Sequence, residues 1–266
     1  MSSRALKQGS ALPIACVLIV GFAASAAAQT ATVPPPQTKP AEVLPAAQKV
    51  IDRHIEAAGG RKAVKAHNSI SITGSMTIPA NGMTGTLQLF AARPNKTVVK
   101  TTIGGIGEIS EGYNGTVAWS MNPMTGPILA TGEELKQKAF DADFDGALNV
   151  ASRYDAIKTL EKTTFEGRPV YKLALTRKGG GDDIEFYDVE TGLKAGAIIE
   201  RQNPMGTIAI TTVVSNYKKF GDLMMPTQMT QSTSGVQIVT TFETVEFDKV
   251  DPAMFELPAA IKALVK

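Results

Sequence analysis

Apolar and polar residues alternate along much of the chain, which is the pattern of half-buried β-strands. Between residues 69 and 78, isoleucine, glycine and methionine alternate with serine and threonine. Asn81-Gly82 then predicts a tight turn, and Leu87 and Leu89 lie on the return strand. Further strand patterns, separated by turn residues, cover residues 96–103, 113–121, 159–165, 170–177, 184–188, 195–202, 207–218, 227–232 and 236–247. Such closely spaced strands predict a mainly β, α+β fold with one large antiparallel sheet, curled or closed, because no βαβ rhythm favours a parallel one.

Two stretches depart from this period and predict helices. The first has apolar residues at helical spacing, namely Val50, Ile51, Ile55 and Ala58. Gly59-Gly60 ends it, and a short second helix is expected over residues 61–67. The second stretch is a helical interlude after Thr131, which stands three residues before Glu134 at the spacing of a capping box. A further short helix is predicted near residues 147–154.

The first residues of the chain have the pattern of an export signal. Residues 1–28 combine basic residues near the start, an apolar run over 11–24 and small residues at the end, which predicts cleavage after Ala28. A proline-rich linker follows over 29–44, and a single folded domain is expected over 45–266. We therefore predict a protein exported to the periplasm, with a retained N-terminal anchor as the alternative.

Charge and cysteine content narrow the class of partner and of chemistry. The net charge of +2 comes from Arg4 and Lys7, because residues 1–28 contain no acid. The chain after Ala28 then holds 25 basic and 25 acidic residues and no basic run, which disfavours nucleic acid as a partner. Cys16 is the single cysteine and would be removed with the signal, which excludes disulfides and thiol chemistry.

Several motifs hint at metal sites or catalysis and lack the residues that these would need. Asp141, Asp143 and Asp145 copy the first half of an EF-hand loop, but Ser152 stands where a bidentate glutamate is required. A solvated acidic helix end is the simpler interpretation. The two histidines, His54 and His67, lack zinc-site spacing and are expected at the surface or at a helix end.

The remaining candidates for catalysis are acidic residues near a glycine cluster. Asp182, Asp183 and Glu185 follow Gly179-Gly180-Gly181, where a hairpin turn with solvated charge is the ordinary explanation. The glycine cluster at 104–107 lacks the spacing of a phosphate-binding loop and also predicts a turn. We therefore expect no enzyme activity, no cofactor and no metal site, although Asp182, Asp183 and Glu185 would be the residues to test if a hydrolysis were found.

The chain resembles the LolA-like superfamily, the group of outer-membrane lipoprotein-sorting proteins. The matching segments are spread over most of residues 44–266: the helix end Ala57-Ala58-Gly59-Gly60, the strand 112–119 (GYNGTVAW), the interlude after Thr131, the segment 217–226 (YKKFGDLMMP) and the closing 250–258 (VDPAMFELP). The resemblance implies an incomplete antiparallel barrel around an apolar cavity, with helices plugging its concave face. It also implies a periplasmic protein that holds acyl chains or lipoproteins.

The strand faces themselves also suggest a ligand cavity, because wide curled sheets leave an interior. The candidate cavity residues are apolar positions of the predicted strands, namely Ile70, Ile72, Met76, Leu87, Leu89, Val117, Trp119, Met121, Ile208 and Ile210. The alternative for each is ordinary core packing, and Trp119 is either a cavity wall or a core anchor.

Two functions remain open at this point. The first is a monomeric, non-enzymatic protein that binds a lipid, an acyl chain or a lipoprotein and carries it across the envelope. The second is a structural or adaptor domain of an envelope assembly, with another envelope protein as its partner.

Overall fold

The computed structural model describes residues 43–203 and 206–265. The predicted signal peptide, its cleavage site and nearly all of the predicted linker therefore lie outside the described residues.

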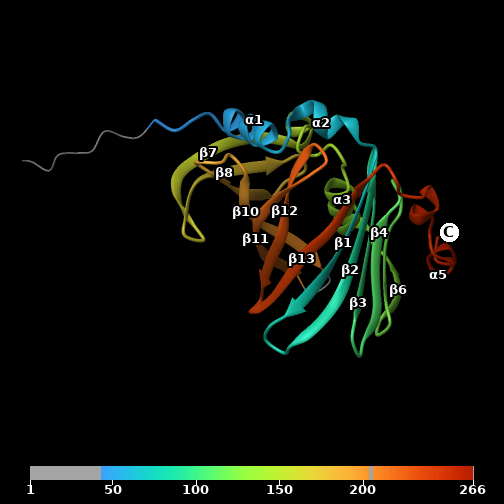
Figure 1. Cartoon of the computed structure of the whole chain (residues 1–266). Coiled ribbons are helices and arrows are strands. Elements are labelled where there is room, and N and C mark those ends of the chain that lie inside the picture. The colour runs from blue at the N-terminus through green and yellow to red at the C-terminus, as the bar shows by residue number, and fades with distance from the viewer. Residues whose placement is uncertain (1–42, 204–205, 266) are drawn as a thin grey trace, which may run out of the picture. The chain divides into compact units, whose positions relative to one another are not determined.

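Thirteen antiparallel strands form one sheet (Figure 1). Their bounds are β1 Ser69–Ile78, β2 Met83–Ala92, β3 Lys96–Ile103, β4 Gly107–Tyr113, β5 Ala118–Asn122, β6 Gly126–Leu129, β7 Tyr154–Phe165, β8 Arg168–Arg177, β9 Asp182–Asp188, β10 Lys194–Asn203, β11 Gly206–Phe220, β12 Leu223–Thr233 and β13 Val236–Phe247. Strands that follow one another in sequence pair with each other, except β6 and β7, and β1 pairs in addition with β13. This one long-range pairing joins the half made of β1–β6 to the half made of β7–β13. The two edges, β6 and β7, do not meet, so the sheet is not closed into a barrel.

The helices connect and cover parts of this sheet. They are α1 Ala47–Ala57, α2 Gly60–Ala66, α3 Gly132–Asp141, α4 Val150–Arg153, the 3-10 helix η1 Pro252–Phe255 and α5 Ala259–Lys262. In Figure 1, α1 and α2 lie across one end of the strands, and α3 lies between the two halves. Because α3 contacts β4 and β5 in one half and β10 in the other, the sheet curls around it.

The glycine pair after α1 brings this helix against a strand turn. Gly59 has φ +124°, which L side chains rarely adopt, and a Cβ there would lie 2.3 Å from the Asp222 carbonyl oxygen. The backbone N–H of Met224 donates to the Ala58 carbonyl oxygen at 2.9 Å, which fixes the β11–β12 turn to the end of α1. Helix α2 starts at Gly60, one residue before the predicted range of 61–67.

The antiparallel, incompletely closed sheet, the N-terminal helix and the helical interlude agree with the prediction from the sequence. Three local details differ. The Thr131 side chain makes no capping hydrogen bond, so the capping box does not form. The single strand predicted over 113–121 is interrupted: Tyr113 ends β4, and the turn at Asn114-Gly115 places it on the opposite face from Trp119 in β5. The short edge strand β6 was not predicted.

Cross-strand register defines two faces of the sheet. Residues directly opposite in antiparallel strands share a face, and alternate residues along one strand do too. Ile72 pairs with Leu89, and Met76 pairs with Thr240 of β13. From Thr240 the register continues through Met229 and Val214 to Ile208 and Ile210 of β11. We call this side the helix-covered face, because it packs against α1, α2 and α3.

The opposite face is covered by the end of the chain. Trp119 is 3% exposed and packs with Val98, Phe255 and Ile261, of which Phe255 belongs to η1 and Ile261 to α5. Figure 1 shows this segment outside the strands, on the side away from α3. Gly112 of β4 allows the indole to lie flat on the sheet, since a Cβ there would lie 2.9 Å from two of its ring carbons.

Candidate functional site

An apolar cavity of about 390 Å³ opens on the helix-covered face. Its walls come from α2, β1, β2, β3, the start of β12, the end of β13 and the segment after α3. The apolar lining residues are Ala58, Val64, Ile70, Leu89, Ala91, Ala142, Phe144, Leu223, Met224, Met225 and Phe247. Two methionines in this set give the walls side chains that adapt to the shape of a bound group.

Of the predicted cavity residues, Ile70 and Leu89 line this apolar cavity. Three more share the helix-covered face farther along β1 and β2, namely Ile72, Met76 and Leu87. Ile208 and Ile210 share that face in the other half of the sheet. Their part in ligand binding stays a prediction.

The other three predicted cavity residues lie elsewhere. Trp119 and Met121 are on the opposite face, where they pack with the C-terminal segment. Val117 precedes β5, two residues before Trp119. Of the two roles considered for Trp119, this position is that of a core anchor. Strand alternation predicts that Trp119 and Met121 share one face of the sheet. It does not predict that the C-terminal segment will cover that face, because this depends on a tertiary contact.

Four polar residues also line the apolar cavity, and one of them is His67. His67 Nδ1 lies 2.8 Å from Asp248 Oδ2, and the imidazole stacks on Phe247 with ring centroids 4.1 Å apart. Asp248 Oδ1 accepts from the backbone N–H groups of Asn68 at 2.6 Å and Ser69 at 3.3 Å. The hydrogen bonds from His67 and Asn68 lower the pKa of Asp248, so its carboxyl stays ionised. His67 follows the last residue of α2, at a helix end as expected, and it is also a fixed part of the cavity wall.

Asp141 and Asp143 line the other polar part of this cavity, and both are paired with arginines. Asp141 Oδ1 lies 2.9 Å from Arg201 Nη2, and Asp143 Oδ2 lies 3.2 Å from Arg153 Nη1. Asp145 pairs with Arg93. The expectation of a solvated acidic helix end is wrong for Asp143 and Asp145, whose side chains are 24% and 23% exposed, whereas Asp141 at the end of α3 is 47% exposed. The arginines come from three elements: Arg153 from α4, Arg93 from the β2–β3 turn and Arg201 from β10.

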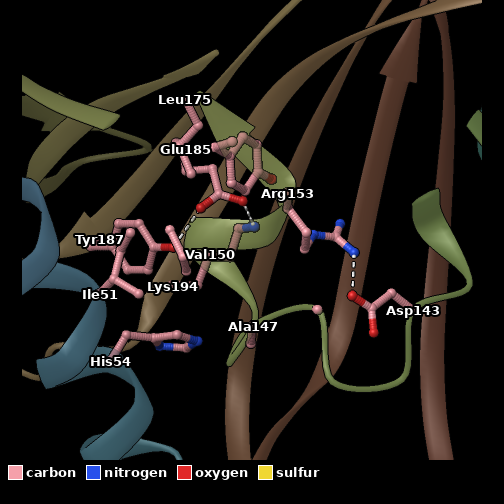
Figure 2. Close-up of a pocket in the computed structure, with 12 residues that line it drawn as sticks. Ile51, His54, Asp143, Ala147, Val150, Arg153, Leu175, Glu185, Tyr187 and Lys194 are labelled. Atoms are coloured by element: carbon pink, nitrogen blue, oxygen red, sulfur yellow. Dashed lines mark hydrogen bonds and ion pairs between the residues drawn. The ribbon is translucent and has the colours of Figure 1, made fainter. Parts of the chain in front are cut away.

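A second, polar cavity of about 260 Å³ lies beneath α1, and Asp143 lines both cavities. Figure 2 shows its polar residues: His54 projects from α1, while Glu185, Tyr187 and Lys194 come from β9 and β10. Glu185 Oε1 lies 2.5 Å from Lys194 Nζ, and the Tyr187 hydroxyl donates to the same carboxylate. The cavity therefore contains an ion pair, in a wall that also includes Ile51, Val150 and Leu175.

The charges in the polar cavity are set by burial and by this ion pair. Burial alone would raise the pKa of Glu185, but the Lys194 ammonium and hydrogen bonds from Lys194 and Tyr187 hold it below its ordinary value. Burial and the Lys194 charge lower the pKa of His54 to about 4, so this imidazole is neutral at pH 7. Its Nδ1 is buried without a hydrogen-bond partner, and its ring packs against Tyr187 at 5.2 Å.

Asp183 adds a further buried carboxylate, which contradicts the expectation of solvated charge after the glycine turn. It is 4% exposed, and its Oδ1 lies 3.4 Å from Arg177 Nε and 4.0 Å from Arg201 Nη1. Period-2 spacing was the signal that could have found it: Asp183, Glu185 and Tyr187 alternate with Ile184 and Phe186, so β9 has one polar and one apolar face. The polar face is covered by α1 and the opposing arginines, and Phe186 on the apolar face packs with Val170 and Ala195 of neighbouring parts of the sheet.

The two cavities differ in what they can do chemically. The apolar cavity offers hydrocarbon contact with one imidazole in its wall, whereas the polar cavity offers a neutral histidine beside a closed ion pair. Neither is lined by serine or cysteine among the described residues, and Thr97 brings one hydroxyl to the apolar cavity. Within the same described ranges, no helix has the length and apolar character needed to cross a membrane.

Comparison with known proteins finds solved structures of similar fold and no similar sequence. No protein-family model matches the sequence, and neither does any curated protein. Among solved structures, the chain is similar to a LolA superfamily protein from Nitrosomonas europaea, with a TM-score of 0.53 and 14% identity over 80% of this chain and 99% of that one. It is also similar to a DUF1329 family protein from Desulfovibrio piger, with a TM-score of 0.54 and 13% identity over 80% of this chain and 98% of that one.

At these identities the likeness concerns the path of the backbone and not the chemistry of a site. It agrees with the sheet topology, the open edges and the enclosed helix described above. The described part of the chain therefore has the LolA-like fold that its sequence resembles.

Proposed function

We propose that this protein is a periplasmic, non-enzymatic binder of an acyl chain, supplied by a lipid or an acylated protein, and that it carries this ligand across the envelope. The observation that carries the proposal is the apolar cavity between α2 and the sheet. Its volume of about 390 Å³ falls in the range of roughly 300–1,000 Å³ typical of small-molecule sites. The export signal predicted over residues 1–28 supports the location, and residues 45–266 would form the binding domain.

The energetics favour hydrocarbon over other small ligands in this cavity. Each methylene moved from water into an apolar site gains about 0.8 kcal/mol, so about eight methylenes would gain roughly 6 kcal/mol before the costs of ordering the ligand. Leu89, Val64 and Met225 offer contacts of this kind from three different elements. The wall of the apolar cavity presents few polar groups. A ligand rich in hydrogen-bonding groups would therefore lose its hydrogen bonds to water without gaining equivalent bonds to the protein.

The first test is whether the purified protein retains lipid. Native mass spectrometry of protein produced in a bacterial host, followed by organic extraction, should detect an acyl compound at up to one molecule per chain. A fluorescent hydrocarbon probe added to delipidated protein should bind and be displaced by long-chain acyl compounds. Failure of every acyl compound to co-purify or to displace the probe would overturn the proposal.

A pair of variants on one strand makes this test specific to the cavity. Ala91→Phe places a ring in the apolar cavity, whereas Gln88→Phe places the same ring on the exposed part of the opposite face of β2. We expect Ala91→Phe to weaken acyl binding about tenfold or more, equal to about 1.4 kcal/mol, and Gln88→Phe to leave it unchanged. Thermal melts of both variants check that each is folded.

The alternative function is a structural or adaptor domain, and the open sheet edges favour it. Ile128 on edge strand β6 is 44% exposed, and Leu160 on edge strand β7 is 39% exposed. Unpaired edges of this kind can accept a strand from another chain. A pull-down from envelope extract that recovers a stoichiometric protein partner and no lipid would favour this function.

A further inference from the structure

We propose that one end of the sheet docks onto the surface of a lipid bilayer through three turns that carry no charge. The turns are those of β1–β2 (residues 79–83), β3–β4 (104–107) and β5–β6 (122–127), and we call them the uncharged tips. In Figure 1 they lie at the end of the strands away from α1 and α2. The inference goes beyond the proposed function and does not depend on a ligand in the apolar cavity, because it assigns the surface by which the protein meets a membrane.

The tips belong to long uncharged segments of the chain. Aspartate, glutamate, lysine and arginine make up 20% of the sequence, yet residues 68–92, 101–107 and 112–132 contain none of them. Each of these segments includes one tip. Because charged residues normally occupy exposed positions, uncharged segments that reach the surface at three turns indicate a surface with a particular partner.

The tips present apolar side chains to solvent. Met124 is 79% exposed, and Ile128, just after the third tip, is 44% exposed. The other apolar side chains of the tips are exposed or half-buried: Pro79, Ala80, Met83, Ile106, Pro123 and Pro127. Contact with an apolar layer would remove this surface from water, which is favourable.

The three tips adjoin one another, so they can meet one surface together. The backbone N–H of Gly104 donates to the carbonyl oxygen of Thr84 at 3.4 Å, which joins the second tip to the start of β2. A Cβ placed on Gly107 would lie 3.3 Å from Pro123 Cγ, so the third tip lies against the second.

The polar groups of the tips are hydrogen-bonded within their own turns. Asn81 Oδ1 accepts from the backbone N–H of Met83 at 3.1 Å, and Asn122 Oδ1 accepts from that of Met124 at 2.8 Å. The backbone N–H of Ile106 donates to the carbonyl oxygen of Ile103 at 3.1 Å. These bonds persist when the turns leave water, which lowers the cost of entering the outer layer of a bilayer.

A band of threonines follows the tips along the strands and favours a bilayer over a protein as the partner. Thr77 pairs with Thr84, and Thr86 pairs with Thr102. The first charged side chain after the second tip, Glu108, lies opposite Thr102 and so at the level of these hydroxyls. From the end of the sheet inward, the surface therefore changes from apolar side chains to hydroxyls and charge. A bilayer has the matching order, with hydrocarbon inside and hydrogen-bonding headgroups outside.

Docking through uncharged tips should be weak, reversible and insensitive to salt. One myristoyl chain binds a bilayer with an association constant of about 10⁴ M⁻¹, and side chains on three turns reach less deeply than such a chain. We therefore expect a constant of about 10³ to 10⁴ M⁻¹. Because the tips carry no charge, anionic lipid is not required and added salt should have little effect.

Flotation of the purified protein with phosphatidylcholine vesicles tests the proposal. Binding should agree within about twofold between low and high NaCl, about 0.05 M and 0.5 M. Met124→Glu puts a charge on an exposed apolar position and should weaken binding about tenfold or more, whereas Met124→Leu should retain it. Leu160→Glu is the matched control, because Leu160 is 39% exposed on β7, which contacts α1; its binding should be unchanged. Thermal melts show that each variant is folded.

Three results would overturn the proposal: no binding to any vesicle, binding that needs anionic lipid and is lost at high salt, or equal binding by Met124→Glu and the unmodified protein. Capture of a protein partner from envelope extract that Met124→Glu fails to capture, without any binding to vesicles, would assign the tips to a protein interface and overturn it equally. Ala91→Phe fills the apolar cavity and should still bind vesicles, so failure of docking is distinguishable from failure of acyl binding.

Discussion

Replacing Lys194 with methionine would leave the Glu185 carboxylate in the polar cavity without its cation. Removing one partner of a buried ion pair generally lowers the free energy of unfolding by about 3–5 kcal/mol. Here the Lys194 side chain is 31% exposed and that of Glu185 is 14% exposed, so water can replace part of the lost interaction. We therefore expect a loss of about 2–3 kcal/mol at pH 7.

The loss should depend on pH in a known direction. In the unmodified protein the pKa of Glu185 is below its ordinary value of 4.5, so its stabilising effect is present above that pH and is lost as the pH falls through the lowered pKa. Without Lys194, burial becomes the main influence and raises the pKa of Glu185. The folded variant then favours the protonated carboxyl, and the difference in stability from the unmodified protein narrows between pH 7 and pH 5.

Urea unfolding of both proteins at the two pH values, followed by circular dichroism, measures these differences. The double variant Glu185→Gln, Lys194→Met is the control, because it removes the charge of both partners and keeps an acceptor for the Tyr187 hydroxyl. It should recover most of the lost stability. A loss in Lys194→Met below about 0.5 kcal/mol, or one that is equal at both pH values, would refute this account of the polar cavity.

Three further variants test the packing and the pH response. Gly112→Ala places a Cβ 2.9 Å from the Trp119 indole, and should cost about 1–3 kcal/mol in urea unfolding and change the tryptophan emission; unchanged stability would contradict this contact. Ile261→Ala removes a side chain that is 0% exposed, and should cost about 2–5 kcal/mol and move the Trp119 emission to longer wavelength; an unmoved emission would count against the C-terminal cover. The lowered pKa of His54, about 4 against 6.5, means that the unfolded chain binds more protons within this window, so stability falls as the pH drops across it. His54→Gln should show a shallower fall between pH 7 and pH 5, and an equal fall would exclude His54 as its source.

The strands could be predicted from the sequence because each carries its own signal. The alternation from Ile70 to Ile78 and the turn at Asn81-Gly82 are local features, and the observed β1–β2 hairpin follows them directly. The resemblance to LolA-like proteins added the incomplete closure of the sheet and the helices on its concave face. What it could not add was the cover of Trp119, because that depends on where residues 252–262 come to lie after folding.

The candidate site was harder to predict, because its polar residues are far apart in sequence. His67 pairs with Asp248 where β1 meets β13, and Arg201 of β10 pairs with Asp141 at the end of α3. A single sequence shows each of these residues as an isolated charge, for which a solvated surface is the ordinary explanation. Only the alternation along β9 offered a local hint, by placing Asp183 and Glu185 on the same face as Tyr187.

The pairing of β1 with β13 determines when the hydrogen bond between His67 and Asp248 can form during folding. His67 and Asp248 are 181 positions apart and lie where these two strands start and end. Contacts of such long range form late in folding, after the loop between them has been closed at a cost in entropy. The hydrogen bond that fixes His67 therefore forms in the same step that joins the two halves of the sheet. A chain whose last strand is missing or unpaired therefore lacks that support for His67 in the wall of the apolar cavity.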